Sequence, residues 1–257
     1  MTSYTMTING KGFDSQSTFD VIDPAAGSPF AACPECTKTQ LDEAMEASWK
    51  AFASWSRDKV KRINMLRECA AALRENRETL ATLLTREQGK PLKDTLSEID
   101  LSVSWFETTA SFDLPVKIIQ DNEKGLIEVT YKPLGVIAAI TPWNVPVLLA
   151  VWKIAPALLA GNTIVVKPSP FTPLTTLKMG EIFRDILPRG VLNIVSGGDE
   201  LGAWMTVHPA VRKISFTGSI ETGKIVAKAA APDLKRFTLE LGGNDPAIVL
   251  PDVDPHG

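Results

Sequence analysis

The 257-residue sequence has few of the residues that stabilise small secreted or metal-dependent folds. Its three cysteines are too few for a disulfide scaffold in a chain of this size. The close pair Cys33 and Cys36 has no second pair of ligands to complete a zinc site, and the only histidines are His208 and His256. The sequence therefore predicts no metal site and a reducing compartment, the cytoplasm.

The sequence also lacks a long uninterrupted apolar run and a strong excess of either charge. Its most apolar stretch, residues 145–160, is interrupted by Pro146, Lys153 and Pro156, so we expect a buried helix rather than a membrane span. Lys and Arg number 27 against 30 Asp and Glu, which gives a net charge of −3. This balance provides no overall attraction to nucleic acid or to an anionic membrane, and we predict that the protein binds neither.

Apolar residues recur at helical spacing in the first part of the chain, residues 1–112. One helix is expected to begin at an N-cap Thr39 with Asp42 at its third position. A second is expected over residues 63–84 and a third after Pro91. These helices carry no obvious chemical cluster. Five tryptophans that lie in helical patterns are predicted to be core residues: Trp49, Trp55, Trp105, Trp152 and Trp204.

Residues 113–132 interrupt the helical pattern with two apolar segments around a polar tip. Residues 116–119 and 126–131 are predicted strands, and residues 121–125 are the predicted turn of a β-hairpin. The hairpin is either an arm that packs on another subunit or a surface feature of its own domain. The pattern alone favours neither.

From residue 134 onward, apolar runs alternate with helical segments. The predicted strands are residues 134–140, 163–166, 192–195, 213–216 and 237–239, and the predicted helices are residues 147–160, 174–187, 200–207 and 222–231. Strands that are apolar on both faces and alternate with helices are typical of a parallel sheet covered on both sides. The sequence therefore predicts an α/β fold with an open parallel sheet over residues 133–243.

Each predicted strand is followed at once by polar residues, glycine or proline. Ligands of an open parallel sheet bind at the carboxyl ends of the strands, where such loops converge. Together the loops supply hydrogen-bond donors, one cation and one carboxylate: Thr141-Pro142-Trp143-Asn144, Lys167-Pro168-Ser169-Pro170, Ser196-Gly197-Gly198, Thr217-Gly218-Ser219 and Glu240-Leu241-Gly242-Gly243.

Two common nucleotide-binding motifs are absent or incomplete. The sequence contains no Gly-x-Gly-x-x-Gly, so a conventional Rossmann dehydrogenase is not indicated. Residues 218–224 fit the first seven positions of a P-loop, but Ile225 stands where a hydroxyl should bind Mg²⁺. A P-loop-like nucleotide hydrolase is kept as an alternative. The turn at Gly218 and Ser219, ahead of a helix, suits an anion in either case.

At these loops the sequence resembles the NAD(P)-dependent aldehyde dehydrogenase superfamily. The resemblance covers nearly the whole chain, and its motifs occur in order and at family spacing: residues 141–144, 152–158, 161–169, 216–219 with Gly223, and 239–243. It implies an oxidoreductase that converts an aldehyde to a carboxylic acid with NAD or NADP. It also implies a Rossmann-type cofactor-binding domain, residues 1–112 and 133–243, and a homo-oligomer assembled through the hairpin arm.

The resemblance assigns catalytic roles to three residues. Asn144 matches the residue whose amide stabilises the hemithioacetal oxyanion. Glu240 matches the base that activates the hydrolytic water, and burial at this strand end is expected to raise the pKa of its carboxyl group. Lys153 matches a lysine assigned to proton relay. The residues alone also allow Asn144 to cap the next helix, Glu240 to face solvent and Lys153 to reach water.

The resemblance also implies a set of cofactor contacts. Lys167 matches a contact to the adenine-side ribose, although a solvated lysine beside a turn fits the pattern too. Pro170 stands where the family usually has a glutamate that binds the ribose hydroxyls, so NADP is an alternative to NAD. The expected contacts are Ile140, Thr141, Pro142, Trp143, Lys167, Ser169, Pro170, Gly198, Phe216, Thr217, Gly218, Ser219, Gly223, Leu241 and Gly242.

The sequence departs from the family at its nucleophile. The family's cysteine lies a few tens of residues beyond the glutamate motif, whereas no cysteine follows Cys69 here. Residues 244–257 match the start of the family's catalytic domain, which is expected to be truncated. The chain as written is therefore expected to lack the thiol chemistry of aldehyde oxidation. The alternative is a catalytically inactive dinucleotide-binding fragment or pseudoenzyme.

Overall fold

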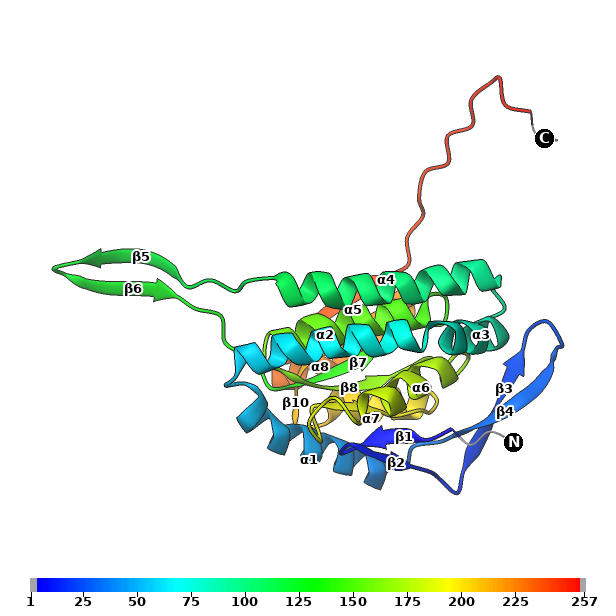
Figure 1. The fold of residues 1–257 in the computed structure, drawn as a ribbon, viewed down its shortest axis with the longest axis horizontal. Helices are drawn as coiled ribbons and strands as arrows, with labels where there is room; N and C mark the ends of the chain where they lie inside the picture. Colours follow the sequence, from blue (N-terminus) through cyan, green and yellow to red (C-terminus); the bar gives the residue numbers. More distant parts are fainter. Residues whose placement is uncertain (1–3, 255–257) are drawn as a thin grey trace.

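A seven-stranded sheet forms the centre of the computed structural model, which describes residues 4–254 (Figure 1). Its strands, in spatial order, are β11 (Arg236–Leu241), β10 (Val211–Gly218), β7 (Val136–Ile140), β8 (Thr163–Lys167), β9 (Leu192–Ile194), β1 (Met6–Ile8) and β2 (Lys11–Phe13). The five strands from β11 to β9 run parallel. The predicted α/β fold with a parallel sheet is therefore confirmed.

Four strands near the N-terminus were not predicted. β1 and β2 extend the sheet in the antiparallel direction, while β3 (Thr18–Asp23) and β4 (Ser28–Pro34) form a separate hairpin. The sequence predicted a helix-rich first part, residues 1–112, without these strands. β1 and β2 have three residues each, too few to show the alternation by which a strand is recognised.

Helices cover both faces of the sheet. One face carries α1 (Lys38–Trp55), α7 (Asp199–Val207) and α8 (Ile220–Ala230), the last followed by a 3₁₀ turn, Ala231–Asp233. The other carries α5 (Pro146–Leu159) and α6 (Leu174–Phe183), over which lie α2 (Lys59–Glu75), α3 (Arg77–Gln88) and α4 (Leu92–Ser111). α5 is the predicted buried helix. None of the helices within residues 4–254 is long and apolar enough to cross a membrane.

The N-terminal helices differ in detail from the sequence prediction. α1 begins at the N-cap Thr37, whose side chain and Gln40 form a reciprocal capping box, rather than at Thr39. The single helix expected over residues 63–84 is two helices, since the chain turns at Asn76. Trp49 and Trp152 are 47% and 46% exposed, so the prediction that they are core residues is wrong.

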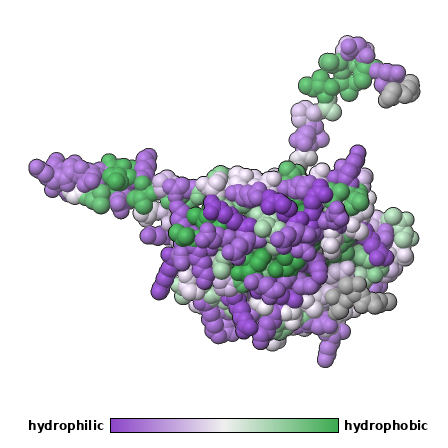
Figure 2. Space-filling view, viewed as in Figure 1, coloured by the Kyte–Doolittle hydropathy of each residue, from purple (hydrophilic) through white to green (hydrophobic). Residues whose placement is uncertain are grey.

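The predicted hairpin is present and projects from the body of the molecule (Figure 1). It consists of β5 (Lys117–Asn122) and β6 (Gly125–Val129), paired antiparallel. Apolar side chains on both strands are exposed (Figure 2): Ile118, Ile119, Leu126, Ile127 and Val129. Residues 242–249 follow β11 without regular secondary structure and lead away from the sheet. His256 lies outside the described residues.

Candidate active site

A cleft of about 1160 Å³ opens at the carboxyl ends of the parallel strands. Loops after β7, β8, β10 and β11 line it, together with one side each of α5 and α7 and the first two turns of α8. The volume exceeds the roughly 300–1,000 Å³ of most small-ligand pockets, so an extended ligand of dinucleotide size can enter. The cleft lies where an open parallel sheet is expected to bind its ligand.

The predicted site residues converge on this cleft with two exceptions. Asn144, Lys153 and Glu240 line it, and so do all the expected cofactor contacts apart from Gly198 and Gly223. Gly223 lies buried in α8, where a Cβ would come within 2.6 Å of a Leu241 methyl carbon, so it serves helix–strand packing. Gly198 is the N-cap of α7, beside Asp199, which does line the cleft.

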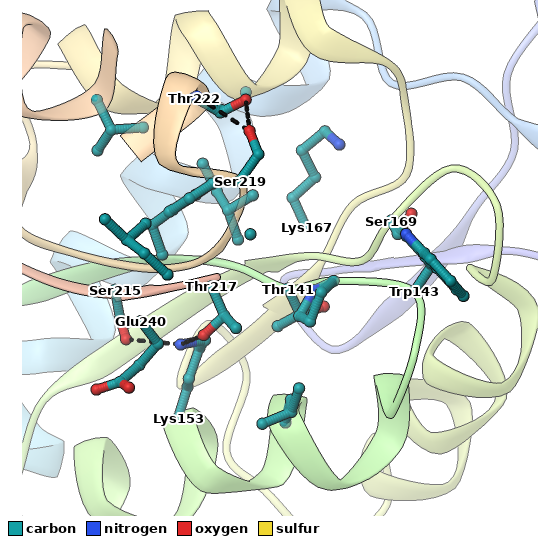
Figure 3. Close-up of a pocket in the computed structure, with 18 of the residues that line it drawn as sticks. Thr141, Trp143, Lys153, Lys167, Ser169, Ser215, Thr217, Ser219, Thr222 and Glu240 are labelled. Atoms are coloured by element: carbon teal, nitrogen blue, oxygen red, sulfur yellow. Dashed lines mark hydrogen bonds between the residues drawn. The ribbon is translucent and has the colours of Figure 1, made fainter. Parts of the chain in front are cut away.

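Lys153 points from α5 toward the end of β10 (Figure 3). Its Nζ donates hydrogen bonds to Thr217 Oγ1 at 2.7 Å and Ser215 Oγ at 3.2 Å. The side chain is buried, so the alternative that it reaches out to water is wrong. Burial lowers the pKa of Lys153 to about 8, against the opposing charge of Glu240. Lys153 can therefore hold or release a proton near neutral pH.

Lys167 ends β8 and is 4% exposed, so it is not a solvated lysine beside a turn. Its stem passes along α7, where Cδ and Cε lie 3.9 and 4.0 Å from the position that a Cβ would take on Gly202. Burial lowers the pKa of Lys167 to about 8, while the charge of Asp199 acts in the opposite direction. A buried cation and a carboxylate thus share this end of the cleft.

Asn144 lies on a loop held by residues that the sequence analysis missed. The N-cap position of α5 is Val145, so the alternative that Asn144 caps this helix is wrong. Glu98 of α4 accepts hydrogen bonds at Oε1 from the backbone N–H groups of Val147 (2.8 Å) and Leu148 (3.2 Å). Lys90 Nζ bonds to Glu98 Oε2 at 2.7 Å and to the Asn144 carbonyl oxygen at 2.9 Å.

Glu87 binds the N-terminus of α6, the helix that follows the Lys167 loop, as Glu98 binds the N-terminus of α5. Its carboxylate accepts hydrogen bonds from the N–H groups of Leu174 and Thr175 at 2.7 and 2.9 Å. Burial raises the pKa of Glu87 to about 7, with a further contribution from the charge of Glu98. The sequence held one signal for these two residues. Glu87 and Glu98 are carboxylates at positions that belong to the buried faces of α3 and α4, where charged residues are rare unless they are paired.

Ser219 is the N-cap of α8, and its Oγ accepts a hydrogen bond from the Thr222 N–H at 3.1 Å (Figure 3). Both side chains line the cleft, at a helix N-terminus that favours an anion. Lys224, the lysine of the P-loop alternative, is exposed on α8 and is not among the described residues that line the cleft. The geometry therefore does not favour a P-loop.

Glu240, near the end of β11, lines the cleft but is exposed, so the expected burial of this carboxylate is wrong. Trp105 and Trp152, which were predicted to be core residues, form an aromatic wall of the cleft. Their rings lie 5.2 Å apart between centroids. The expected contact Trp143 also lines the cleft, from the loop after β7. This wall suits an apolar group.

The three cysteines are buried free thiols outside the cleft. Burial raises the pKa of Cys33 and Cys36 to about 12, which leaves them protonated at neutral pH. Among residues 4–254, no three His, Cys, Asp or Glu side chains are grouped as a metal site. Within the described chain, no thiol is placed to act as a nucleophile in the cleft.

Comparison with known proteins agrees with the fold and identifies the family. The family model for the aldehyde dehydrogenase family matches residues 13–256. Aldehyde dehydrogenase LUC3 of a Fusarium species is 39% identical over 254 residues, which make up 98% of this chain and 54% of that protein. The chain spans about half the length of the curated relatives it matches.

Solved structures give the same result. A mutant aldehyde dehydrogenase from Bacillus cereus superposes with a TM-score of 0.94 at 33% identity, covering 98% of this chain and 54% of that one. Betaine aldehyde dehydrogenase from Staphylococcus aureus, in a structure that contains NAD⁺, gives 0.89 at 36% identity over 94% of this chain and 50% of that one. On its sequence and its fold, this chain belongs to the aldehyde dehydrogenase family.

Proposed function

We propose that the chain forms the dinucleotide-binding part of an enzyme that oxidises an aldehyde to a carboxylic acid with NAD or NADP. The observation that carries this proposal is the convergence of Asn144, Lys167, Ser219 and Glu240, from four different loops or strand ends, on one cleft. A bound nicotinamide dinucleotide supplies the acceptor for the hydride that leaves the aldehyde carbon. The binding and positioning come from the residues of the cleft.

The cleft offers suitable partners for each part of the dinucleotide. Lys167 and the loop after β8 would hold the adenosine ribose, and the first turn of α8 at Ser219 would hold the phosphates. Apolar side chains of Ile225 and Val226 provide a wall for a flat base. These residues fit the group in size, charge and hydrogen bonding.

The catalytic residues would act at the opposite end of the cleft. The Asn144 amide would donate to the oxygen that becomes negative when a nucleophile attacks the aldehyde. Glu240 would remove a proton from the water that releases the acid, with Lys153 as a nearby proton carrier. The nucleophile itself must enter from elsewhere, because Cys33, Cys36 and Cys69 are buried outside the cleft.

Calorimetric titration of the chain with NAD⁺, NADP⁺ and Mg·ATP tests the proposal. We expect either dinucleotide to bind and Mg·ATP to bind weakly. Lys167→Met should weaken dinucleotide binding about tenfold, the effect of losing one hydrogen bond to a charged group, while Lys224→Met on the surface of α8 should leave it unchanged. Tighter binding of Mg·ATP that depends on Lys224 would favour the nucleotide hydrolase instead.

We also propose that the β5–β6 hairpin binds a second copy of the chain. An isolated two-stranded hairpin is marginally stable, and this one exposes apolar side chains on both strands. Most soluble oligomers are assembled from identical subunits. Sedimentation of Leu126→Asp should show a smaller species than the parent protein, whereas Lys124→Asp at the polar tip should not. Identical sedimentation of all three would rule out this role.

A further inference from the structure

The charged residues of the cleft form two pairs of opposite sign. Among residues 4–254, the charged side chains that line it are Lys153, Lys167, Asp199 and Glu240. Lys153 and Glu240 belong to the side where β10 and β11 end. Lys167 and Asp199 belong to the side of β8 and β9, since α7 directly follows β9. An extended ligand therefore meets one lysine and one carboxylate at each end.

The Lys167 side chain, from the end of β8, packs against the face of α7 that carries Asp199. The Lys167 stem passes within 4.0 Å of the Cβ position of Gly202. Asp199 precedes Gly202 by three residues, so both belong to one face of the helix. Asp199 is exposed in the first turn of α7, where its charge also reaches the Lys167 ammonium group. The two charges therefore act on the same part of a bound ligand.

Whether a carboxylate opposes the Lys167 cation at this end decides which dinucleotide is favoured. A carboxylate accepts hydrogen bonds from the free ribose hydroxyls of NAD, whereas the 2′-phosphate of NADP requires an unopposed cation. Pro170 supplies no carboxylate from the β8 loop, and Lys167 alone would attract the phosphate. Asp199 restores a negative charge from the neighbouring helix.

We infer that Asp199 is a specificity-determining residue that makes this cleft select NAD over NADP. The inference rests on the proposed dinucleotide-binding function. A 2′-phosphate would bring two negative charges toward the Asp199 carboxylate, and such like-charge contacts disfavour binding strongly. The ribose hydroxyls of NAD would instead find in Asp199 the acceptor that Pro170 does not provide.

Titration of the chain with NAD⁺ and NADP⁺ at low and moderate ionic strength tests the inference. The parent chain should bind NAD⁺ more tightly. Asp199→Asn should shift the ratio of the two dissociation constants about tenfold toward NADP⁺, with a smaller shift at higher salt because the effect is electrostatic. Glu200→Gln is the matched control, since Glu200 is the next residue of α7 but does not line the cleft.

Two further variants sharpen the test. Asp199→Ser removes the carboxylate but leaves a short polar side chain in the first turn of α7, and it should shift the ratio in the same direction as Asp199→Asn. Pro170→Glu in the Asp199→Asn background should return the preference to NAD⁺, because it places a carboxylate on the loop that follows Lys167. Thermal unfolding of each variant checks that the fold is kept.

The outcomes separate this inference from the proposed function. A parent chain that prefers NADP⁺, or Asp199 variants that bind both dinucleotides in the parent ratio, would overturn the role of Asp199 and leave the dinucleotide site intact. A parent chain that binds neither dinucleotide would overturn both. An equal shift for Glu200→Gln would show a general charge effect and would also overturn the inference.

Discussion

Lys90 and Glu98 form an ion pair of 2.7 Å beneath the loop that carries Asn144. Glu98 is 3% exposed and also binds the first N–H groups of α5, while Lys90 holds the Asn144 carbonyl oxygen. The N-terminal helices therefore do more than cover the sheet. Glu98 of α4 and Lys90, in the connection between α3 and α4, set the position of a loop in the candidate active site.

Glu98→Ala should lower the free energy of unfolding by about 3–5 kcal/mol, the usual effect of removing one partner of a buried ion pair. The variant leaves Lys90 without its carboxylate and the start of α5 without its acceptor. Urea unfolding measures the change. Glu107→Ala is the control on the same helix: its pair with Arg74 is about half exposed and should contribute less than about 1 kcal/mol.

Glu87 should make stability fall as the pH rises from about 4.5 to about 7. The pKa of this buried carboxyl is raised from 4.5 to about 7, so in that range the folded chain binds a proton that the unfolded chain has lost. The effect amounts to about 3 kcal/mol over the whole range and is constant above it. Glutamine at this position does not titrate, so the free energy of unfolding of Glu87→Gln should gain on that of the parent by about 3 kcal/mol between pH 4.5 and pH 7. The difference between the two should then stay constant at higher pH. Parallel curves would contradict the prediction.

Gly190→Ala should destabilise the fold strongly. Gly190 has a φ of +80°, and a Cβ there would overlap the backbone carbonyl of Ala47 in α1. Ser48 Oγ in α1 also donates a hydrogen bond to the Gly190 carbonyl oxygen at 3.2 Å. Gly27→Ala is the control, with a φ of +65° but open space around it. Gly27→Ala should lower the free energy of unfolding by about 1–2 kcal/mol, the cost of placing a Cβ on a left-handed backbone. Calorimetry should show a clearly larger loss of stability for Gly190→Ala.

Under the proposed function, Glu240→Gln should slow release of the acid more than hydride transfer in a form of the protein that carries the thiol. Loss of a general base costs about 10²–10⁴-fold in the step it serves. Rapid-mixing kinetics should then show a burst of reduced cofactor followed by slow turnover. Equal loss in both steps would exclude Glu240 as the base for acid release.

The elements of the parallel sheet were readable because each is a local pattern. β7 and β8 are continuous apolar runs, and each is followed by polar residues that begin a loop. Parallel strands place their carboxyl ends at one edge, so the loops that hold Lys167 and Ser219 had to meet. The short strands β1 and β2 and the turn at Asn76 carry no such local signal.

The amino-acid sequence by itself determined the fold class, the family and the identity of most residues in the cleft, because repeating apolar patterns and loop motifs are local properties of the chain. Only the tertiary structure decided the environment of each side chain. It buried Lys167 beside Asp199, left Glu240 exposed and placed Glu98 under the Asn144 loop. Burial and charge pairing depend on residues far apart along the chain, and no local pattern contains them.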